Sequence, residues 1–330
     1  MTSATRWGIL ATGKIARDFA ENLHATPGAV IAAVGSRSRE SAEAFAHDLG
    51  DEHTRAHASY DDLVADPDVD VVYVASPHSH HLAHARLAFA AGRPVLCEKP
   101  LTLTRADGEA LFDAAGDLFC MEAMWMACHP LIRDLRTRLA AGEFGTPRQV
   151  HADLGFVVPG DASDRMWDPA LGAGALLDMG IYPLTFARLM LGPYAAAVAA
   201  GVVSERGVDL DVAIAARHES GAVSALSTSM TSASPRAASV ATDEGLLVVP
   251  ADFHHPTHAV WTPDGGEPQR IEPPSEVYGT GLGNEAAHVQ DCLRDGLTES
   301  PLVPRAQTLE LLGVMDDLRR QVGVSYVADR

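Results

Sequence analysis

The chain has 330 residues, too many for one average domain and suited to two. Its 25 basic and 44 acidic side chains give a formal net charge of −19 at pH 7. A chain this negative repels nucleic-acid phosphates and anionic lipid, which excludes both as partners and favours a small-molecule substrate.

The cysteines indicate a reducing compartment. Cys97, Cys120, Cys128 and Cys292 form no C-x-x-C pair, which predicts buried thiols in a cytoplasmic protein. The segment before the first expected strand lacks the apolar core of a signal peptide. The longest mostly apolar stretch, around residues 194–203, is too short to span a bilayer.

Strands and helices alternate through the first part of the chain. Apolar runs predict strands at residues 7–10, 30–34, 69–75, 94–97 and 118–121. Between them, helical patterns occupy residues 15–23, 39–49, 61–65, 80–91 and 104–115. This alternation predicts a doubly wound parallel sheet, and we expect residues 1–124 to form a Rossmann domain.

The pattern changes after residue 124. Helices are expected at residues 130–141, 173–190, 284–294 and 307–322, with a strand at 149–156. Several strand-like runs follow between residues 196 and 250, and Ser220-Gly221 and Asp264-Gly265 are typical hairpin turns. Residues 125–330 are therefore predicted to form an α+β domain with a large, mainly antiparallel open sheet.

The first strand-to-helix turn carries a dinucleotide motif. The sequence Ala11-x-Gly13-x-x-Ala16 matches G-x-G-x-x-G/A with an alanine at its first position. Gly13 lets a pyrophosphate approach the backbone, where amide groups at the helix start bind it. Ala11 suits the turn only if its φ stays negative. The predicted contacts in this turn come from Ala11, Thr12, Gly13, Lys14 and Ile15.

The end of the second strand favours NADP over NAD. NAD enzymes place an acid about 20 residues beyond the glycine motif, but this chain has Ser36-Arg37-Ser38 there. Arg37 can stack on adenine and pair with a 2′-phosphate, and the two serines can donate hydrogen bonds.

These motifs, with several others, resemble the Gfo/Idh/MocA family. Its branch of dimeric dihydrodiol dehydrogenases and NADP-dependent D-xylose (aldose) 1-dehydrogenases is the most similar. The further segments that carry the resemblance are Ala75–His81, Cys97–Pro100, Met121–Trp125 and Leu171–Pro183. The resemblance implies the two-domain fold, a homodimer or dimer of dimers, and an active site in the cleft between the domains. It adds Ser76, Pro77, His78, His81, Glu98 and Lys99 to the expected cofactor contacts.

The predicted catalytic residues are Lys99, Asp178 and Tyr182. Lys99 follows a parallel strand, at the edge where open α/β sheets bind ligands, and its charge can stabilise an alkoxide or depress the pKa of Tyr182. A tyrosine needs such a cation to act as an acid/base near neutral pH.

Asp178 and Tyr182 are four residues apart on an expected helix and share one face. Gly180 between them is expected to leave room for substrate, and Pro183 to kink the helix. Inositol dehydrogenase relatives carry histidine where this chain has Tyr182, which favours the dihydrodiol and aldose branch.

Three more side chains are expected to contact substrate: Trp125, Arg165 and Trp167. The tryptophans offer a sugar an apolar face, and Arg165 can bind hydroxyls. The alternatives are an apolar core for the tryptophans and a surface pair with Asp164 or Asp168 for Arg165.

The histidines do not predict a metal site. His78 and His81 are expected to line the cofactor cleft, and His80 and His84 to face solvent. His254, His255 and His258 lie in an expected loop.

The sequence thus predicts an oxidoreductase that transfers a hydride between NADP and a carbinol carbon of a sugar or cyclic diol. Two alternatives stay open at this point. One is a relative that retains its NAD and cleaves glycosidic bonds, and the other is an NADP-binding sensor without catalysis.

Overall fold

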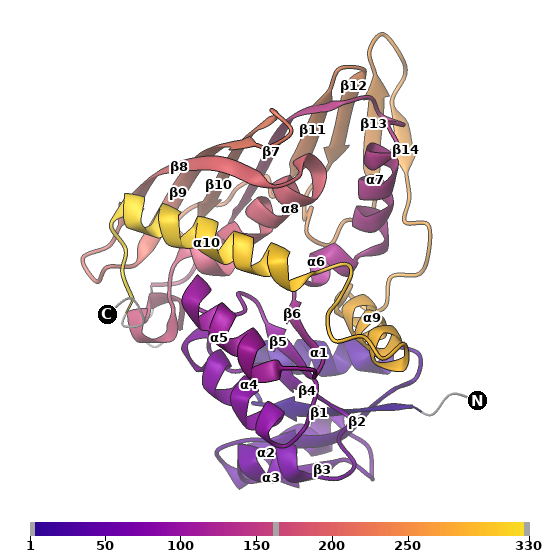
Figure 1. The fold of residues 1–330 in the computed structure, drawn as a ribbon, viewed down its shortest axis with the longest axis vertical. Helices are drawn as coiled ribbons and strands as arrows, with labels where there is room; N and C mark the ends of the chain where they lie inside the picture. Colours follow the sequence, from indigo (N-terminus) through magenta and orange to yellow (C-terminus); the bar gives the residue numbers. More distant parts are fainter. Residues whose placement is uncertain (1–3, 161–164, 327–330) are drawn as a thin grey trace. The chain divides into compact units, whose positions relative to one another are not determined.

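The computed structural model describes residues 4–160 and 165–326, which form two compact units (Figure 1). The first unit runs up to Thr102 and adds Ala106–Cys128 and Val277–Leu309. The second comprises Leu103–Arg105, His129–Glu276 and the residues from Glu310 on. The expected boundary after residue 124 lies close to Cys128, but the return of Val277–Leu309 to the first unit was not expected.

The first unit is built on a parallel sheet with the strand order β3-β2-β1-β4-β5-β6. This is the order of dinucleotide-binding Rossmann domains. Its strands are β1 (Thr5–Leu10), β2 (Ala29–Gly35), β3 (Arg55–His57), β4 (Val71–Val74), β5 (Val95–Glu98) and β6 (Cys120–Ala123). Every residue of β4 and β5 is buried, as in strands covered on both faces. The predicted parallel sheet is confirmed, but the three-residue β3 was not expected because Arg55-Ala56-His57 has no apolar run.

Seven helices of the described chain lie in this unit, α5 with all but its first residue. They are α1 (Lys14–His24), α2 (Arg39–Leu49), α3 (Tyr60–Ala65), α4 (His81–Ala90), α5 (Arg105–Ala115), α6 (Trp125–Cys128) and α9 (Leu282–Arg294). A 3-10 turn, η1 (His78–His80), precedes α4. The late helix α9 packs against α1 and α6, which explains why its segment belongs to the first unit.

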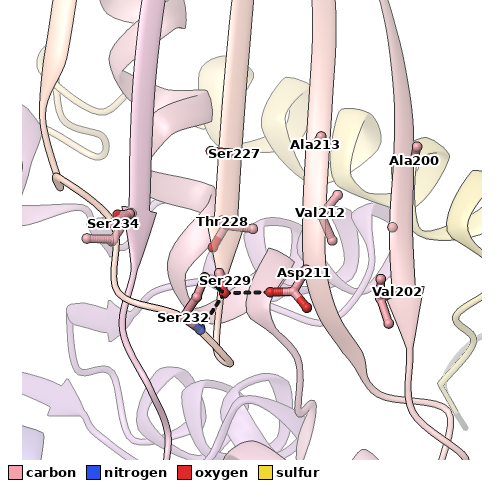
Figure 2. Close-up of a pocket in the computed structure, with 12 residues that line it drawn as sticks. Ala200, Val202, Asp211, Val212, Ala213, Ser227, Thr228, Ser229, Ser232 and Ser234 are labelled. Atoms are coloured by element: carbon pink, nitrogen blue, oxygen red, sulfur yellow. Dashed lines mark hydrogen bonds between the residues drawn. The ribbon is translucent and has the colours of Figure 1, made fainter.

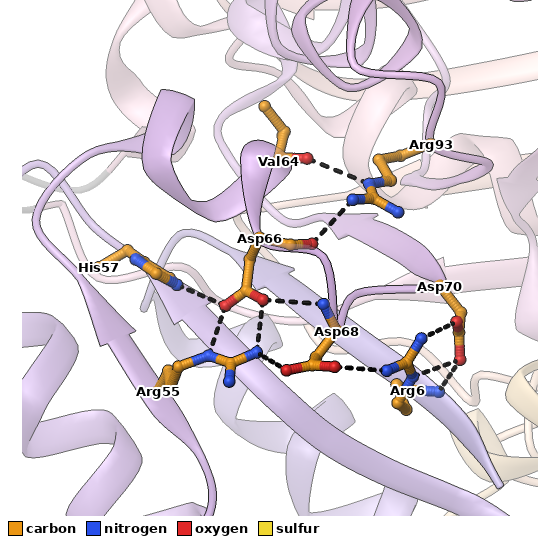
Figure 3. Close-up of polar contacts among 8 residues, drawn as sticks. All are labelled: Arg6, Arg55, His57, Val64, Asp66, Asp68, Asp70 and Arg93. Carbon is orange, nitrogen blue, oxygen red and sulfur yellow. Dashed lines mark hydrogen bonds and ion pairs between the residues drawn. The ribbon is translucent and has the colours of Figure 1, made fainter.

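An ion-pair network joins the strand beginnings of this sheet (Figure 3). The carboxylate of Asp66, only 1% exposed, accepts bonds from Arg55 Nε at 2.7 Å and the Asp68 amide at 2.9 Å, and it lies 2.8 Å from His57 Nε2. Burial would raise the pKa of Asp66, but these bonds outweigh it and lower the pKa to about 2. Arg6 near the start of β1 and Asp70 just before β4 place that part of the network at the amino-terminal ends of these strands, away from the glycine motif.

We expect Asp66→Asn to lower the free energy of unfolding by about 2 kcal/mol at pH 7. The folded pKa of about 2 lies below the usual 3.8, so this stabilisation is present above pH 3.8 and is lost as the pH falls toward 2. Urea unfolding at several pH values measures both effects. Asp68→Asn, at a carboxylate that is 49% exposed, is the matched control and should cost less than about 1 kcal/mol. An Asp66→Asn protein as stable as the wild type at pH 7 would contradict this.

The second unit contains an eight-stranded sheet with the order β14-β13-β12-β11-β7-β10-β9-β8. All neighbouring strands are antiparallel except β7 and β10. The strands are β7 (Pro147–Gly155), β8 (Tyr194–Val203), β9 (Asp209–His218), β10 (Val223–Ser229), β11 (Ala238–Thr242), β12 (Gly245–Val249), β13 (Ala259–Pro263) and β14 (Gln269–Ile271). The predicted large, mainly antiparallel sheet is confirmed.

The helices of the second unit include α7 (Pro130–Ala140) and α8 (Ile181–Leu191), and α8 packs on β7 and β10. The short turns η2 (Arg165–Trp167), η3 (Pro169–Leu171) and η4 (Leu176–Gly180) precede α8. The last helix, α10 (Arg305–Val322), begins in the first unit and continues into the second. Residues in β9 and β10 alternate between buried and exposed, so one face of the sheet is covered and the other is open.

Among the residues that the structure describes, one apolar helical stretch is long enough to cross a membrane. It is Pro169–Leu191, and 89% of its most apolar window is buried inside the structure, as in the core helix of a globular unit. The four cysteines are all buried thiols, as predicted.

Candidate active site

The backbone amides in the turn after β1 are not capped by a side chain. Gly13 is the N-cap of α1, the helix has no acidic residue in its first turn, and no side chain caps it. A Cβ built on Gly13 would meet no atom within 4 Å. These features fit a bound pyrophosphate, because free amides and a helix dipole would face it without a competing carboxylate.

The conformation of Ala11 corrects one expectation. Its φ is +89°, whereas a negative value was expected for an alanine at this position. The turn therefore keeps the geometry for which the family motif uses glycine, and the alanine tolerates a backbone that L-residues rarely adopt. The Ala11 amide donates to the Gly35 carbonyl at 3.0 Å, which holds the turn against the end of β2.

Ser36-Arg37-Ser38 follows β2 directly. Ser36 is buried, while Arg37 and Ser38 are exposed, and Ser38 caps α2 by accepting the Ser41 amide. The guanidinium of Arg37 is close enough to Tyr60 to act on its phenol, although burial is the larger effect and raises the pKa of Tyr60. Tyr60 was not expected here, because it precedes a short helix far from any motif.

Ser76, which follows β4, lies beside the ring of His84. The ring of His84 packs on Tyr60 with centroids 4.8 Å apart, and its Nδ1 lies 2.8 Å from the Ser76 hydroxyl. The expectation that His84 faces solvent is therefore wrong, while His80 is exposed as predicted. Burial lowers the pKa of His84 to about 4, so it is neutral at pH 7.

His81 is a support rather than a lining residue. It is fully buried, with Nε2 2.8 Å from the Ser76 carbonyl and Nδ1 3.1 Å from the Pro100 carbonyl. Burial lowers its pKa to about 4, and the neutral ring links the ends of β4 and β5. This corrects the expectation that His81 lines the cofactor cleft. His78 is also buried, with its ring 5.7 Å from that of His81, and Pro77, which precedes η1, is half-buried.

Lys99 follows β5 immediately and is half-buried. Its backbone amide donates to the Glu98 carboxylate at 3.1 Å, and the Tyr73 hydroxyl donates to the other oxygen of Glu98. The Lys99–Pro100 peptide bond is cis. The strand end that carries the lysine is therefore held by a buried carboxylate.

In the second unit, Asp178 and Tyr182 lie on two successive helical segments. Asp178 belongs to the π-helical turn η4 and Tyr182 to the first turn of α8, and both are buried. A single α-helix over residues 173–190 was expected. Pro183 lies within the first turn of α8, where its missing amide is tolerated, so the irregularity is the π turn before it.

Two residues that sequence reasoning did not single out hold this segment. Asp209 at the start of β9 accepts the Leu176 amide at 2.6 Å, and burial raises the pKa of Asp209 to about 6. A Cβ on Gly174, whose φ is +131°, would lie 2.1 Å from Asp209 Oδ1, so only glycine fits. Asp209 thus anchors the beginning of η4 through the Leu176 amide.

Gly180 has a packing role. A Cβ there would lie 3.0 Å from Leu176 Cδ1 and 3.2 Å from Thr228 Cγ2. The expected space for substrate at Gly180 is therefore filled by side chains, and the glycine allows η4 to lie close to β10.

Arg165 pairs with Asp178 across 2.9 Å, not with Asp168, and Asp164 lies outside the described residues. The side chain of Arg165 is 44% exposed while that of Asp178 is 10% exposed, so the arginine end of the pair faces solvent.

The two tryptophans expected to contact substrate lie in different units. Trp167 Nε1 donates to the Pro159 carbonyl at 2.9 Å, and Trp125 in the first unit is half-buried.

His254 is a further group beside Tyr182. The two rings have centroids 5.0 Å apart, although the loop that carries His254 comes long after α8 in the chain. Donor atoms of Asp252, His254 and His255 lie within 4.8 Å of one another, the spacing of a possible metal site. Asp252 is also paired with Arg236 at 3.2 Å.

A Rossmann sheet with an open phosphate turn, joined to an α+β unit with a buried Asp–Tyr segment, defines a dinucleotide-dependent oxidoreductase. Residues 5–122 match the model of the oxidoreductase family with an NAD-binding Rossmann fold, and residues 132–248 match the GFO/IDH/MocA C-terminal domain. The chain belongs to the Gfo/Idh/MocA oxidoreductase family.

Its relatives match over their full length. Trans-1,2-dihydrobenzene-1,2-diol dehydrogenase of Xenopus laevis is 33% identical, with 98% of this chain and 99% of the relative covered. D-xylose 1-dehydrogenase (NADP(+)) of Hypocrea jecorina is 35% identical, with 97% and 93% covered.

Among solved structures, the 3-ketoreductase KijD10 of Actinomadura kijaniata with NADP and TDP-benzene is 26% identical, with a TM-score of 0.83 over 98% of this chain and 99% of that one. The aldose-aldose oxidoreductase of Caulobacter crescentus is 24% identical, with a TM-score of 0.88 over 97% and 98%, which shows the shared fold.

Proposed function

We propose that this enzyme is an NADP-dependent dehydrogenase that acts on a carbinol carbon of a sugar or a cyclic diol. The observation that carries the proposal is the Glu98-Lys99-Pro100 turn at the carboxyl end of β5, on the sheet edge that also holds the open phosphate turn. The names of the full-length relatives, a diol dehydrogenase and a xylose dehydrogenase, support the substrate class.

In the proposed mechanism Tyr182 transfers the proton of the substrate hydroxyl, and Lys99 supplies the positive charge. When bound, NADP would accept or donate the hydride. In the oxidation direction the Tyr182 phenolate would take the proton of the substrate hydroxyl and become the phenol, and the Lys99 ammonium would stabilise the alkoxide. Asp178, held by Arg165 in an ion pair, would orient the substrate or the lysine. Trp125 and Trp167 are proposed to contact the substrate through their apolar faces.

The lysine content of the chain supports a special role for Lys99. Lys14 and Lys99 are the only lysines among the 25 basic residues. Lys14 is 87% exposed and pairs with Asp18, whereas Lys99 lies at the end of a buried strand. A lysine can give up its proton near a reaction centre and an arginine cannot, which fits a lysine at this position.

The preference for NADP is proposed from Arg37. Its side chain is exposed at the end of β2, beside Tyr60, and the segment Ser36–Ser38 contains no carboxylate that would repel a 2′-phosphate.

We expect Arg37→Ala to weaken NADPH binding by about 1–3 kcal/mol, the scale of a lost charge-assisted bond, and to leave NADH binding nearly unchanged. Fluorescence titration of both cofactors measures the effect. Arg39→Ala, which removes a neighbouring exposed arginine that faces Glu43, is the matched control. Tighter binding of NADH than of NADPH by the wild type would refute the preference.

The function itself is tested by a substrate screen. Aldoses, cyclic diols and ketosugars are incubated with NADP or NAD and followed at the nicotinamide absorbance. We expect turnover with at least one of these classes and a preference for NADP.

A second copy of the chain is proposed to cover the open face of the second sheet. Most exposed side chains of β8, β9 and β10 on this face are small or apolar, with Arg217 as a charged exception, and Val198, Val202 and Val223 are 61%, 56% and 44% exposed. A shallow hollow of about 490 Å³ lies across β8, β9 and β10. Its lining residues are drawn in Figure 2, among them Ser229, whose hydroxyl donates to Asp211. A large face on which small and apolar side chains predominate suits a self-complementary interface.

We therefore expect a dimeric or larger mass by light scattering at micromolar concentration. Val223→Lys, which places a charge on this face, should shift the mass toward that of the 34.9 kDa monomer. A monomeric wild type would overturn the proposal.

A further inference from the structure

The chain turns back after helix α10 and buries Tyr326 in the second unit. Gly323 follows the helix with a φ of +84°, a conformation that glycine adopts without strain. The Val324 amide donates to the Arg319 carbonyl at 3.0 Å. The Gly323 amide donates to the Arg320 carbonyl at 3.3 Å. These two bonds form a Schellman motif, which redirects the chain at the end of a helix.

Tyr326 is held through both its hydroxyl and its ring. The hydroxyl donates to the Ala173 carbonyl, in the segment that leads into η4. The guanidinium of Arg319 lies over the ring, 4.7 Å from its centroid. Arg319 is itself buried and pairs with Asp316, one helical turn earlier, at 2.5 Å. A buried tyrosine with a bonded hydroxyl and a cation over its ring has a defined position.

The segment 173–176 is held at both of its ends. Tyr326 binds the carbonyl of Ala173, and Asp209 accepts the amide of Leu176 at 2.6 Å. Burial raises the pKa of Asp209 to about 6, and the Arg319 guanidinium opposes that rise. The same guanidinium therefore acts on both groups that hold this segment.

A further hydrogen bond connects this segment to Asp178. The Asp178 amide donates to the Gly174 carbonyl at 3.3 Å, and Gly174 lies between the two held positions. The π turn that carries Asp178 continues directly into α8, where Tyr182 lies in the first turn. A shift of Ala173 would therefore displace Asp178 and the beginning of α8.

Helix α10 is a fixed support for these contacts. Near its end, Gln321 Oε1 accepts the Ala199 amide at 2.8 Å and Gln321 Nε2 donates to the Ala197 carbonyl at 3.2 Å. Both partners belong to β8, the edge strand of the sheet. Nearer the middle of the helix, Glu310 pairs with Arg188 of α8 at 2.8 Å. A helix attached at two points can hold Tyr326 in a constant position.

We propose that Tyr326 is a positioning residue, which holds the Ala173 carbonyl and thereby keeps Asp178 in one geometry. Tyr326 touches neither substrate nor cofactor in this proposal. The effect on the segment 173–176 is independent of the reaction. The effect on turnover rests on the proposed function, in which Asp178 orients the substrate or the lysine.

Hydrogen exchange of the full chain tests the effect on the segment. Tyr326→Phe removes the bond to Ala173 but keeps the ring under Arg319, so the variant should remain folded. Mass spectrometry of peptides that cover residues 173–182 should show exchange that is about three- to tenfold faster than in the wild type, on the scale of one lost buried hydrogen bond. Tyr194→Phe is the matched control, because it removes a hydroxyl that donates to the Leu184 carbonyl outside these peptides. It should leave their exchange unchanged.

Kinetics test whether the effect passes through Asp178. Tyr326→Phe should lower kcat about tenfold, since a small displacement of a reacting geometry is costly, and should leave NADPH affinity unchanged. Added to Asp178→Asn, it should lower kcat little further, because the group that it positions is already altered. A general loosening of the unit would instead lower kcat by the same factor in both backgrounds.

Wild-type exchange over residues 173–182 in Tyr326→Phe would overturn the inference. In an enzyme that turns over, an unchanged kcat, or an equal loss with and without Asp178→Asn, would also overturn it. The exchange experiment needs no substrate. A chain in which Tyr326→Phe speeds exchange but which turns over no sugar or diol would contradict the proposed function and leave the hold of Tyr326 on the segment standing.

Discussion

Tyr182→Phe is expected to lower kcat by about 10²–10⁴-fold, the usual contribution of a positioned acid/base. The substitution removes only the phenol hydroxyl, and because Tyr182 is 7% exposed, the remaining ring keeps its packing against the core and His254. NADPH affinity should be unchanged, since Tyr182 is not assigned to the cofactor. Steady-state kinetics and fluorescence titration measure both quantities.

The matched control is Tyr194→Phe. Tyr194 is another tyrosine of the second unit, and its hydroxyl donates to the Leu184 carbonyl at 2.8 Å. This control should change stability but not the chemical step. Near-normal turnover of Tyr182→Phe would show that another group moves the proton, and His254, 5.0 Å away by ring centroids, would be the first to examine.

Lys99→Met should reduce kcat at least as much as Tyr182→Phe, because the ammonium serves both the alkoxide and the tyrosine in the proposed mechanism. Methionine keeps the length and apolar character of the side chain, so the turn after β5 should remain folded. NADPH binding should persist, since the phosphates are assigned to the turn after β1 and to Arg37.

Lys99→Arg separates the two roles of the lysine. Arginine keeps the positive charge but cannot release its proton. If charge alone matters, Lys99→Arg should recover part of the activity that Lys99→Met loses, as measured by kcat at saturating substrate. Full activity of Lys99→Met would remove the lysine from the mechanism.

The first unit is largely predictable from its sequence because its signals are local. Parallel strands covered on both faces appear as apolar runs, and their carboxyl ends meet at one edge. Ala11, Ser36, Ser76 and Lys99 can therefore be assigned to the same edge from the order of strands and helices alone. Strand β3 is one exception, because three residues with one small apolar side chain carry no periodic signal, and the return of Val277–Leu309 to this unit is another.

The second unit is less predictable because its important contacts join distant segments. Asp209 anchors Leu176, and His254 reaches Tyr182, but no spacing in the sequence links these pairs. The π turn at Leu176–Gly180 has a composition similar to that of an α-helix, so the sequence does not distinguish the two. The positive φ of Ala11 and the filled space at Gly180 depend on packing that a single sequence does not display.

The central claim is that this enzyme moves a hydride between NADP and a carbinol carbon, and isotope transfer tests it most directly. D-xylose carrying deuterium at C1, or a trans-dihydrobenzenediol deuterated at its carbinol carbons, is incubated with NADP⁺ and the enzyme, and the cofactor is analysed by mass spectrometry. The account predicts NADPH that carries one deuterium from at least one substrate, and no such product with Tyr182→Phe on the same time scale. Tight NADP binding without deuterium transfer from any sugar or diol would contradict it.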